Sequence, residues 1–332
     1  MGELSAGLVV AGFDGTVAGA PELTRAFSRT ARLAGFVVFA RNIETLEQTR
    51  ALTDAIRMQY AGGDPPILAI DQEGGRVVRL HDSVEAIPAA AALGEIGDAD
   101  ACRRVGTRVA VDLRRAGFTV NFAPVLDLAI EPGNTVIGSR SFGSDPERVI
   151  ACAGAFAQGL RDGGVVPTFK HFPGHGSTDV DSHFDLPVVN VDEATFRGRD
   201  LVPFVRLLSG NAGVAVMSGH VVVRAFDNEN PATLSHRLLT DVLRGEMGFD
   251  GVCFTDCLQM DAVAKTVGTP KAAARAIAAG ADCVVISRGI DVAYACAEAI
   301  ERAVEQGELS RERYMEAHER VGNLRRSLCS LE

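Results

Sequence analysis

The polar residues between positions 170 and 187 form the densest group of chemically capable side chains in the sequence. The stretch Lys-His-Phe-Pro-Gly-His-Gly-Ser-Thr-Asp-Val-Asp-Ser-His-Phe-Asp-Leu-Pro holds three histidines, one lysine and three aspartates. Its proline and glycine content is incompatible with a helix. Because strand-forming residues precede it at 164–169, we expect a long loop at the end of a strand, outside the core, that carries active-site groups.

Asp181 and His183 are the pair within this stretch that is best suited to proton transfer. An aspartate can accept the ring N–H of a nearby histidine, orient the imidazole and stabilise its protonated form. Such a pair can exchange protons near neutral pH. The alternative is that the two side chains only close a turn.

Asp256 directly follows the apolar run 251–255, so its carboxylate is expected at the end of a buried strand. There it could act as a nucleophile or as an electrostatic stabiliser. Alternatively, it could serve as the N-cap of the next helix.

Charged residues also follow other predicted strands. Together they would form a ring of donors and acceptors suited to sugar hydroxyls, although each alone would be an ordinary solvated group: Asp71, Arg79, Arg140 and Lys170. If the strand at 165–169 continues, Lys170 and His171 point in opposite directions, and only one of them faces inward.

Two spacings resemble metal sites, but neither is complete. His171-x3-His175 is interrupted by Phe-Pro-Gly, which breaks the helix that would align the two rings. Cys253-x3-Cys257 lacks a second cysteine pair. We therefore expect no metal ion, and we interpret Gly174 and Gly176 as hinges of the loop rather than as a phosphate-binding turn.

Short apolar runs alternate with amphipathic segments along the chain. The predicted strands are 8–13, 35–39, 66–70, 118–122, 165–169, 213–217, 251–255 and 282–286. The predicted helices are 22–34, 43–60, 99–116, 146–162, 194–208, 235–246, 271–279, 291–305 and about 310–328. Apolar strands covered on both faces indicate a parallel sheet.

Eight β-then-α units predict an α/β fold of the single (β/α)8 TIM-type barrel class. A doubly wound sheet would also alternate strands and helices, but eight units favour closure. No linker divides the chain, so residues 1–332 are expected to form one domain. The polar residues follow the carboxyl ends of the strands, where a barrel places its chemistry.

The composition excludes several classes of partner. A formal net charge of −10 argues against binding to nucleic acid or to an anionic membrane surface. The first residues lack a basic segment followed by a long apolar run, so we expect a cytoplasmic protein. The seven cysteines are expected to be free thiols. No additional interface element is evident, and we expect a monomer.

Six segments resemble, in order, motifs of glycoside hydrolase family 3. They are Asp-Gln-Glu-Gly-Gly-Arg at 71–76, Asn-Phe-Ala-Pro-Val-Leu-Asp at 121–127, Val-Ile-Gly-Ser-Arg-Ser-Phe at 136–142, Lys-His-Phe-Pro-Gly-His-Gly at 170–176, Asp-Ser-His at 181–183 and Thr-Asp-Cys-Leu-Gln-Met at 255–260. The resemblance covers nearly the whole chain. More narrowly, it is to the single-domain bacterial β-N-acetylglucosaminidases, or β-N-acetylhexosaminidases, of cell-wall recycling.

This resemblance implies a retaining exo-enzyme that removes N-acetylglucosamine from the non-reducing end of peptidoglycan-derived fragments. Asp256 matches the nucleophile that forms a covalent glycosyl ester, His183 matches the general acid/base, and Asp181 matches its partner. The resemblance implies neither a metal nor an organic cofactor. The positions that hold the sugar hydroxyls and the acetamide are matched by Asp71, Arg79, Arg140, Lys170 and His171.

Two positions depart from the family pattern, and several activities remain open. Ser139 stands where related sequences often have an acidic residue, and Cys257 stands where an acidic or small residue is common, which leaves rate and leaving-group preference open. The loop at 173–187 is expected to swing over the substrate. The alternatives are a β-N-acetylglucosaminide phosphorylase, a family 3 β-glucosidase and a catalytically silent sugar-binding protein of the same fold. The sequence does not fix the aglycone.

Overall fold

The computed structural model describes residues 5–81, 85–178, 186–210 and 213–329. Eight parallel strands close into a barrel in the order β1-β10-β9-β7-β5-β4-β3-β2, so the predicted (β/α)8 barrel is confirmed. The barrel strands are β1 (Val9–Ala11), β2 (Gly35–Val37), β3 (Ile67–Ile70), β4 (Val120–Asn121), β5 (Val166–Phe172), β7 (Ala215–Ser218), β9 (Cys253–Cys257) and β10 (Cys283–Ile286).

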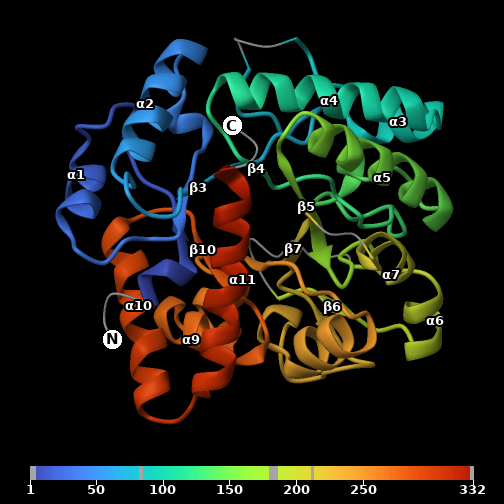
Figure 1. Cartoon of the computed structure of the whole chain (residues 1–332). Helices are drawn as coiled ribbons and strands as arrows, with labels where there is room; N and C mark the ends of the chain where they lie inside the picture. The colour runs from blue at the N-terminus through green and yellow to red at the C-terminus, as the bar shows by residue number, and fades with distance from the viewer. Residues whose placement is uncertain (1–4, 82–84, 179–185, 211–212, 330–332) are drawn as a thin grey trace.

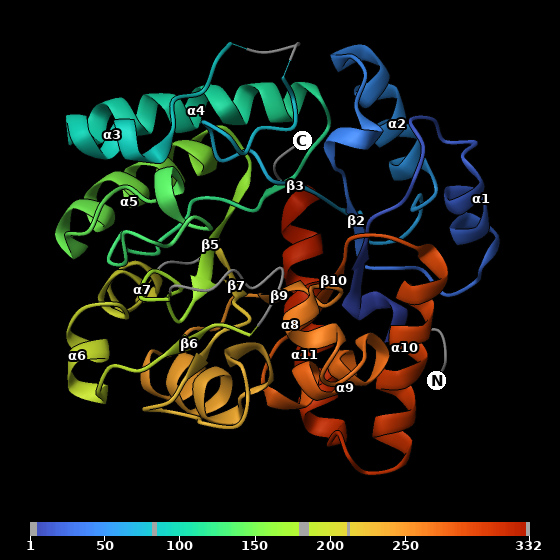
Figure 2. The same ribbon diagram turned by 180° about the vertical axis from the view of Figure 1, so that it is seen from behind.

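Helices surround the barrel on its outside (Figures 1 and 2). The longer ones are α1 (Pro21–Ser28), α2 (Leu46–Met58), α4 (Ala99–Arg115), α5 (Pro146–Asp162), η5 (Arg237–Glu246, a π-helix), α9 (Thr269–Ala279), α10 (Ile290–Glu305) and α11 (Arg311–Cys329). The shorter ones are η1 (Ser5–Leu8), η2 (Ala40–Asn42), α3 (Ala90–Ile96), η3 (Gly138–Arg140), α6 (Glu193–Gly198), α7 (Val202–Leu208), η4 (Ala232–Leu234) and α8 (Asp261–Ala264).

Side-chain caps set where several helices begin. The Thr45 side chain accepts a hydrogen bond from the backbone N–H of Gln48, so α2 starts at Leu46 rather than at the predicted position 43. Asp145 caps α5 in the same way, and Pro146 occupies its first turn, where no backbone donor is needed. The predicted helix 146–162 is therefore confirmed at both ends.

Two further helix predictions were wrong in extent. The segment predicted at 22–34 ends at Ser28, because the buried residues Leu33 and Ala34 belong to the approach to β2 and not to a helix face. The segment predicted at 194–208 is divided into α6 and α7. Pro203 lies in the first turn of α7, the helical position that tolerates its missing N–H.

A small parallel sheet of β6 (Val188–Val189) and β8 (Val222–Val223) lies outside the barrel and was not predicted. Two-residue strands carry no detectable alternation, so their pairing is a tertiary effect. Strand β6 follows residues 179–185 along the chain, and those residues lie outside the described ranges.

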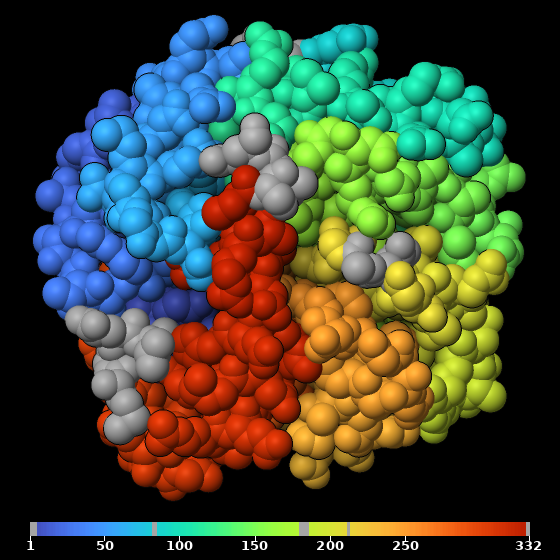
Figure 3. Space-filling model, in the orientation of Figure 1, coloured from blue at the N-terminus to red at the C-terminus, as the bar shows by residue number. Residues whose placement is uncertain are grey.

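The two ends of the barrel are covered differently. Helix α11 crosses the face at which the strands begin and covers its middle (Figures 1 and 3). The predicted helix at about 310–328 corresponds to this element. At the opposite end, Phe122 and Phe254 pack edge to face inside the barrel with ring centroids 5.4 Å apart. Phe122 also lines a cavity that opens at this carboxyl-terminal end.

Candidate active site

A cavity of about 700 Å³ lies at the carboxyl-terminal end of the barrel. The side chains that line it follow strands β2, β3, β5, β9 and β10 and the loop after β4. The sequence-predicted site residues among them are Asp71, Arg79, Arg140, Lys170, His171 and Asp256. The structure thus brings together every predicted site residue that it describes.

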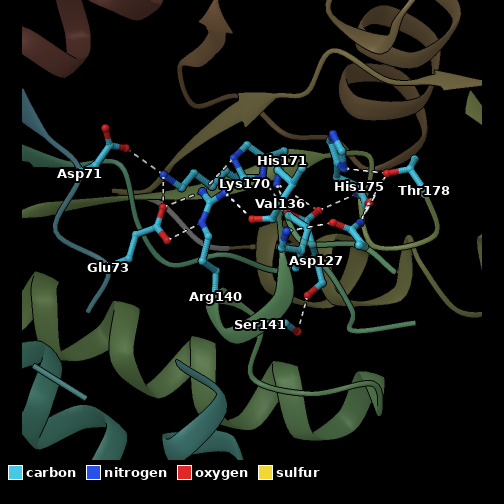
Figure 4. Close-up of polar contacts among 12 residues, drawn as sticks. Asp71, Glu73, Asp127, Val136, Arg140, Ser141, Lys170, His171, His175 and Thr178 are labelled. Carbon is cyan, nitrogen blue, oxygen red and sulfur yellow. Dashed lines mark hydrogen bonds and ion pairs between the residues drawn. The ribbon is translucent and has the colours of Figure 1, made fainter. Parts of the chain in front are cut away.

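Lys170 lines the cavity, and its side chain extends toward Asp71 and Glu73 (Figure 4). Its Nζ atom is 2.9 Å from Asp71 Oδ1 and 2.6 Å from Glu73 Oε1, and only 3% of its side chain is exposed. Burial alone would lower the pKa of the ammonium group, but the two carboxylates outweigh burial and raise it. Lys170 therefore stays positively charged. It can donate hydrogen bonds, but it does not act as a general acid.

Glu73 links this lysine to Arg140. The Arg140 Nε and Nη2 atoms donate to the two Glu73 carboxylate oxygens, each at 2.8 Å, in a bidentate pair. Although burial opposes ionisation, Arg140 and Lys170 hold the pKa of Glu73 well below its usual range. Sequence reasoning missed Glu73. It stands two residues after Asp71, so strand periodicity could have placed both side chains on the same side.

His171 is held by a second carboxylate that sequence reasoning did not identify as part of the site. Asp127 Oδ2 is 2.6 Å from His171 Nδ1, and Asp127 also accepts the backbone N–H groups of His171 and His175. Burial disfavours the Asp127 anion, but His171 and these donors lower its pKa. The imidazole is thereby oriented with Nε2 at 3.4 Å from Arg140 Nη2.

Strand β5 corrects the predicted direction of Lys170 and His171. The strand continues to Phe172 instead of ending at position 169, and both side chains line the cavity, where alternation predicted only one. The pairing of β5 with β7 shifts its register between Phe169 and Phe172. Such an irregularity re-aims side chains at the rim of a barrel.

His175 corrects the expectation that the polar stretch lies outside the core. It is 2% exposed, and its Nδ1 atom is 3.0 Å from Thr178 Oγ1. Burial lowers the pKa of His175 to about 4, against the opposing charge of Asp127. The start of the stretch, including Phe172 and Thr178, is therefore interior, because Asp127 and neighbouring groups satisfy its polar atoms.

The His171 and His175 rings lie edge to face with centroids 6.2 Å apart. Their Nδ1 atoms contact Asp127 and Thr178, respectively. Within residues 5–81, 85–178, 186–210 and 213–329, no three His, Cys, Asp or Glu side chains are grouped so that they could hold a metal ion.

Asp256 belongs to strand β9 and lines the cavity, and it is not a helix N-cap. Its Oδ1 atom accepts the backbone N–H of Cys257 at 2.7 Å, whereas helix α8 begins five residues later, after Met260. Burial would raise the pKa of this carboxyl group, but its interactions with His171, with His220 and with the backbone N–H of Cys257 lower it. An ionised carboxylate in a partly enclosed cavity can act as a nucleophile.

Several predicted features of the catalytic loop lie outside the described residues. Asp181 and His183, with seven of the fifteen residues of the loop expected to swing, fall in the range 179–185. Of the two departures from the family pattern, Cys257 lines the cavity, whereas Ser139 is exposed in η3. Cys257 is therefore the departure that contacts the site.

The barrel carries a carboxylate and a wall of buried charged side chains at its carboxyl-terminal end. This arrangement is typical of barrel enzymes. Residues 21–324 match the glycosyl hydrolase family 3 N-terminal domain. The chain belongs to this family and is a glycoside hydrolase.

Known relatives extend this comparison. The chain is 41% identical over 262 residues to a β-hexosaminidase of Alkalilimnicola ehrlichii, covering 77% of this chain and 74% of that protein. It is 43% identical to a β-hexosaminidase of Chromobacterium violaceum, covering 76% and 71%.

A solved structure agrees with these relatives. A glycoside hydrolase family 3 β-N-acetylglucosaminidase from Paenibacillus sp. str. FPU-7 superimposes with a TM-score of 0.94 at 37% identity. The match covers 98% of this chain but only 63% of that longer chain. Among the helices of the described ranges, none combines the length and apolar character needed to cross a bilayer.

Proposed function

We propose that the chain is a retaining exo-β-N-acetylglucosaminidase that acts on peptidoglycan-derived fragments through a covalent glycosyl ester on Asp256. The observation that carries this proposal is the ionised Asp256 carboxylate at the end of β9, in the same cavity as the Lys170 network. The β-hexosaminidase names of the relatives and the Paenibacillus β-N-acetylglucosaminidase support an N-acetylhexosamine-containing substrate.

Asp256 performs the first displacement. A free carboxylate oxygen attacks the anomeric carbon and displaces the aglycone oxygen, which takes a proton from His183. Neutral His183 then removes a proton from water, and the resulting hydroxide attacks the same carbon and releases Asp256. Two inversions retain the β configuration. Asp181 orients the imidazole and stabilises its protonated form.

The wall formed by Asp71, Glu73, Arg140, Lys170 and His171 holds the sugar. Lys170 and Arg140 can donate to hydroxyl and acetamide oxygens, and Asp71 can accept from hydroxyl groups. Because Glu73 and Asp127 fix Lys170, Arg140 and His171 before substrate arrives, little side-chain entropy is lost on binding. This preorganisation places the anomeric carbon against Asp256.

We further propose that the enzyme acts as a single domain over residues 1–332, as a cytoplasmic monomer and without a cofactor. In that setting it would recycle wall fragments whose aglycone is an anhydromuramoyl-peptide or a similar group.

Turnover of an aryl β-N-acetylglucosaminide, compared with the β-glucoside, tests the proposal. We expect N-acetylglucosamine release from the first compound, independent of phosphate. Preferential release of sugar 1-phosphate would instead identify a phosphorylase, and preference for the glucoside would identify a β-glucosidase. No turnover would favour a silent binding protein.

Replacement of His183 by alanine tests the acid/base role. With a substrate that has a poor leaving group, we expect turnover to fall by about 10² to 10⁴, the usual contribution of general acid/base catalysis. An aryl glycoside whose leaving group needs no proton should lose much less in the glycosylation step. Equal losses in that step for both substrates would contradict the role given to His183.

A further inference from the structure

The cavity has two halves with different charge balances. In the half formed by the ends of β3 to β5, three cations that line the cavity (Arg79, Arg140 and Lys170) are paired with the carboxylates of Asp71 and Glu73. The opposite half follows strands β10, β1 and β2. We call its two arginines, Arg41 and Arg288, the cationic rim.

Arg41 is a fixed component of this rim. Its Nε atom lies 2.8 Å from Asp14 Oδ1 and 3.1 Å from the carbonyl oxygen of Phe13, and its Nη2 donates to the Ser287 carbonyl. The guanidinium also lies over the Phe39 ring, 4.7 Å from the centroid. These contacts anchor the charge at the rim while 26% of the side chain stays exposed.

Arg288 has an anchored backbone and an open side chain. Its backbone N–H donates to Gln259 Oε1 at 2.9 Å, and its carbonyl accepts from Gln259 Nε2 at 2.8 Å. Gln259 follows Asp256 by three residues, so the rim is tied to the strand of the proposed nucleophile. The Arg288 side chain is 65% exposed, and its Nε is 3.6 Å from Asp14.

The described ion pairs of the rim leave it with more positive than negative charge, because Asp261, a carboxylate that also lines the cavity, pairs with Lys265 instead. Asp14 is the single carboxylate that Arg41 and Arg288 share, and 59% of its side chain is exposed. Burial, followed by the charge of Arg288, lowers the pKa of Arg41, although Asp14 and Glu22 oppose this shift. A second anion at this position would relieve the repulsion between the two guanidinium groups.

Apolar surface accompanies this positive charge. Phe39 and Met260 line the same side of the cavity and are partly exposed. An aromatic face and a thioether suit the apolar face of a sugar ring, whereas arginine forks suit planar carboxylates. The chemistry of this half therefore differs from that of the hydroxyl-binding wall.

We propose that the cationic rim is a binding site for the carboxylate of an acidic aglycone, and that Arg288 discriminates acidic from neutral aglycones. The inference rests on the proposed function, because the aglycone leaves from the carbon that Asp256 attacks. The ligand class is a carboxylated saccharide or a saccharide that carries an acidic peptide. The adjoining Phe39 and Met260 surface favours such a group over free inorganic phosphate, which has no ring to pack.

A matched pair of aryl β-N-acetylglucosaminides tests the site, one with a 4-carboxylate and one with the neutral 4-carboxamide. Arg288→Gln should lower kcat/KM for the carboxylate by roughly three- to tenfold more than for the carboxamide, the range expected of a partly exposed ion pair. Arg288→Glu should enlarge the difference, and Arg288→Lys should restore part of it. Added salt should reduce the wild-type preference.

Arg302→Gln is the matched control, because Arg302 is a half-exposed arginine on α10, 3.9 Å from Glu298. It should leave the ratio of the two kcat/KM values unchanged. An unchanged ratio in Arg288→Gln would overturn the inference. Phosphate stimulation that yields sugar 1-phosphate and is lost in Arg288→Gln would also overturn it, by assigning the rim to an attacking anion.

Binding of the same two glycosides to an Asp256→Asn variant, measured by calorimetry, gives a readout that needs no turnover. The inference predicts tighter binding of the carboxylate, and loss of that preference when Arg288→Gln is added. Equal affinities would contradict it. Failure of hydrolysis with a preserved carboxylate preference would contradict the proposed function alone.

Discussion

The barrel carries a buried ionic network at each end, and the two networks have different structures. At the carboxyl-terminal end, Lys170 and Arg140 alternate with Asp71 and Glu73 along the wall of an open cavity. At the amino-terminal end, one buried carboxylate, that of Asp282, contacts three arginines from η5 and α11.

Asp282 has no exposed surface and accepts, in addition, the backbone N–H of Cys253 at 2.9 Å. Arg244 also donates to the carbonyls of Phe249 and Gly251, at 2.9 and 2.7 Å. The charged and hydrogen-bonding groups of this amino-terminal network thus contact other groups of the protein. Helix α11 lies over this end, as Figure 3 shows.

The difference separates binding from stability. Both networks use arginine and carboxylate groups, but only the carboxyl-terminal one leaves donors and acceptors facing a cavity of about 700 Å³. The amino-terminal one joins α11 to the barrel. Substitutions in the carboxyl-terminal network should therefore affect mainly activity, and substitutions in the amino-terminal network should affect mainly the free energy of unfolding.

The largest effect is expected from Asp256→Asn. Loss of the nucleophile should reduce turnover of either an aryl or a saccharide substrate by at least about 10⁴-fold, as in other enzymes that lose a covalent nucleophile. The circular dichroism spectrum should stay that of a folded barrel. Retention of most activity would remove Asp256 as the nucleophile.

Asp282→Asn should give the largest loss of stability. Neutralising this carboxylate leaves Arg244, Arg313 and Arg320 without the anion that they share in the interior, which costs about 3–5 kcal/mol in the free energy of unfolding. Urea titration measures this loss, while kcat at a temperature where the protein is folded should change little.

Asp250→Asn is its control. Asp250 pairs with Arg320 at 2.9 Å but is 87% exposed, so the expected loss is below about 1 kcal/mol. Similar losses in the two variants would show that the buried network is not what joins α11 to the barrel.

Glu73→Gln should act mainly on catalysis. The variant keeps the side-chain size but removes the anion that holds Lys170 and Arg140. Because misplaced binding groups can cost about a hundredfold in rate, we expect kcat/KM to fall by roughly 10². Glu298→Gln, an exposed change on α10, serves as the control. Loss of stability with unchanged kcat/KM would assign Glu73 a structural role only.

A smaller, pH-dependent effect compares one histidine near each end. Burial lowers the pKa of His175 and of His318 on α11 to about 4, from 6.5. Between these pH values the unfolded chain binds protons that the folded chain does not. The free energy of unfolding should therefore be highest above about pH 6.5 and fall as the pH drops toward 4.

His318→Phe tests this linkage without touching the cavity. It keeps an aromatic ring against Tyr314, whose centroid lies 4.5 Å from that of His318, and removes one titrating group. The fall in stability should become less steep by up to about 1.4 kcal/mol per pH unit. An identical pH profile in the variant would show that His318 is protonated equally well in the folded and the unfolded chain.

The eight barrel strands could be predicted because each is a short apolar run, buried on both faces, between longer periodic segments. The division between α6 and α7 was missed, since apolar spacing continues across it and Pro203 gives only a local signal. The β6–β8 pairing joins two-residue strands across 32 intervening residues, from Val189 to Val222, and no local pattern encodes it.

The site was predictable where residues follow strands, as for Asp71, Lys170 and Asp256. Glu73 and Asp127 were missed because their importance arises from charges that the fold brings to them from distant segments. Lys170 and His171 both line the cavity in a segment where the pairing of β5 with β7 shifts its register, and the sequence of β5 alone does not reveal that shift.

Trapping of the glycosyl-enzyme tests the central claim most directly. A β-N-acetylglucosaminide with a good leaving group and a 5-fluoro substituent should form the ester faster than water cleaves it. Intact-protein mass spectrometry should then show the addition of one sugar residue, and peptide mapping should place it on Asp256. Turnover without any adduct, an adduct on another residue, or release of the α-anomer as the first product would contradict the account.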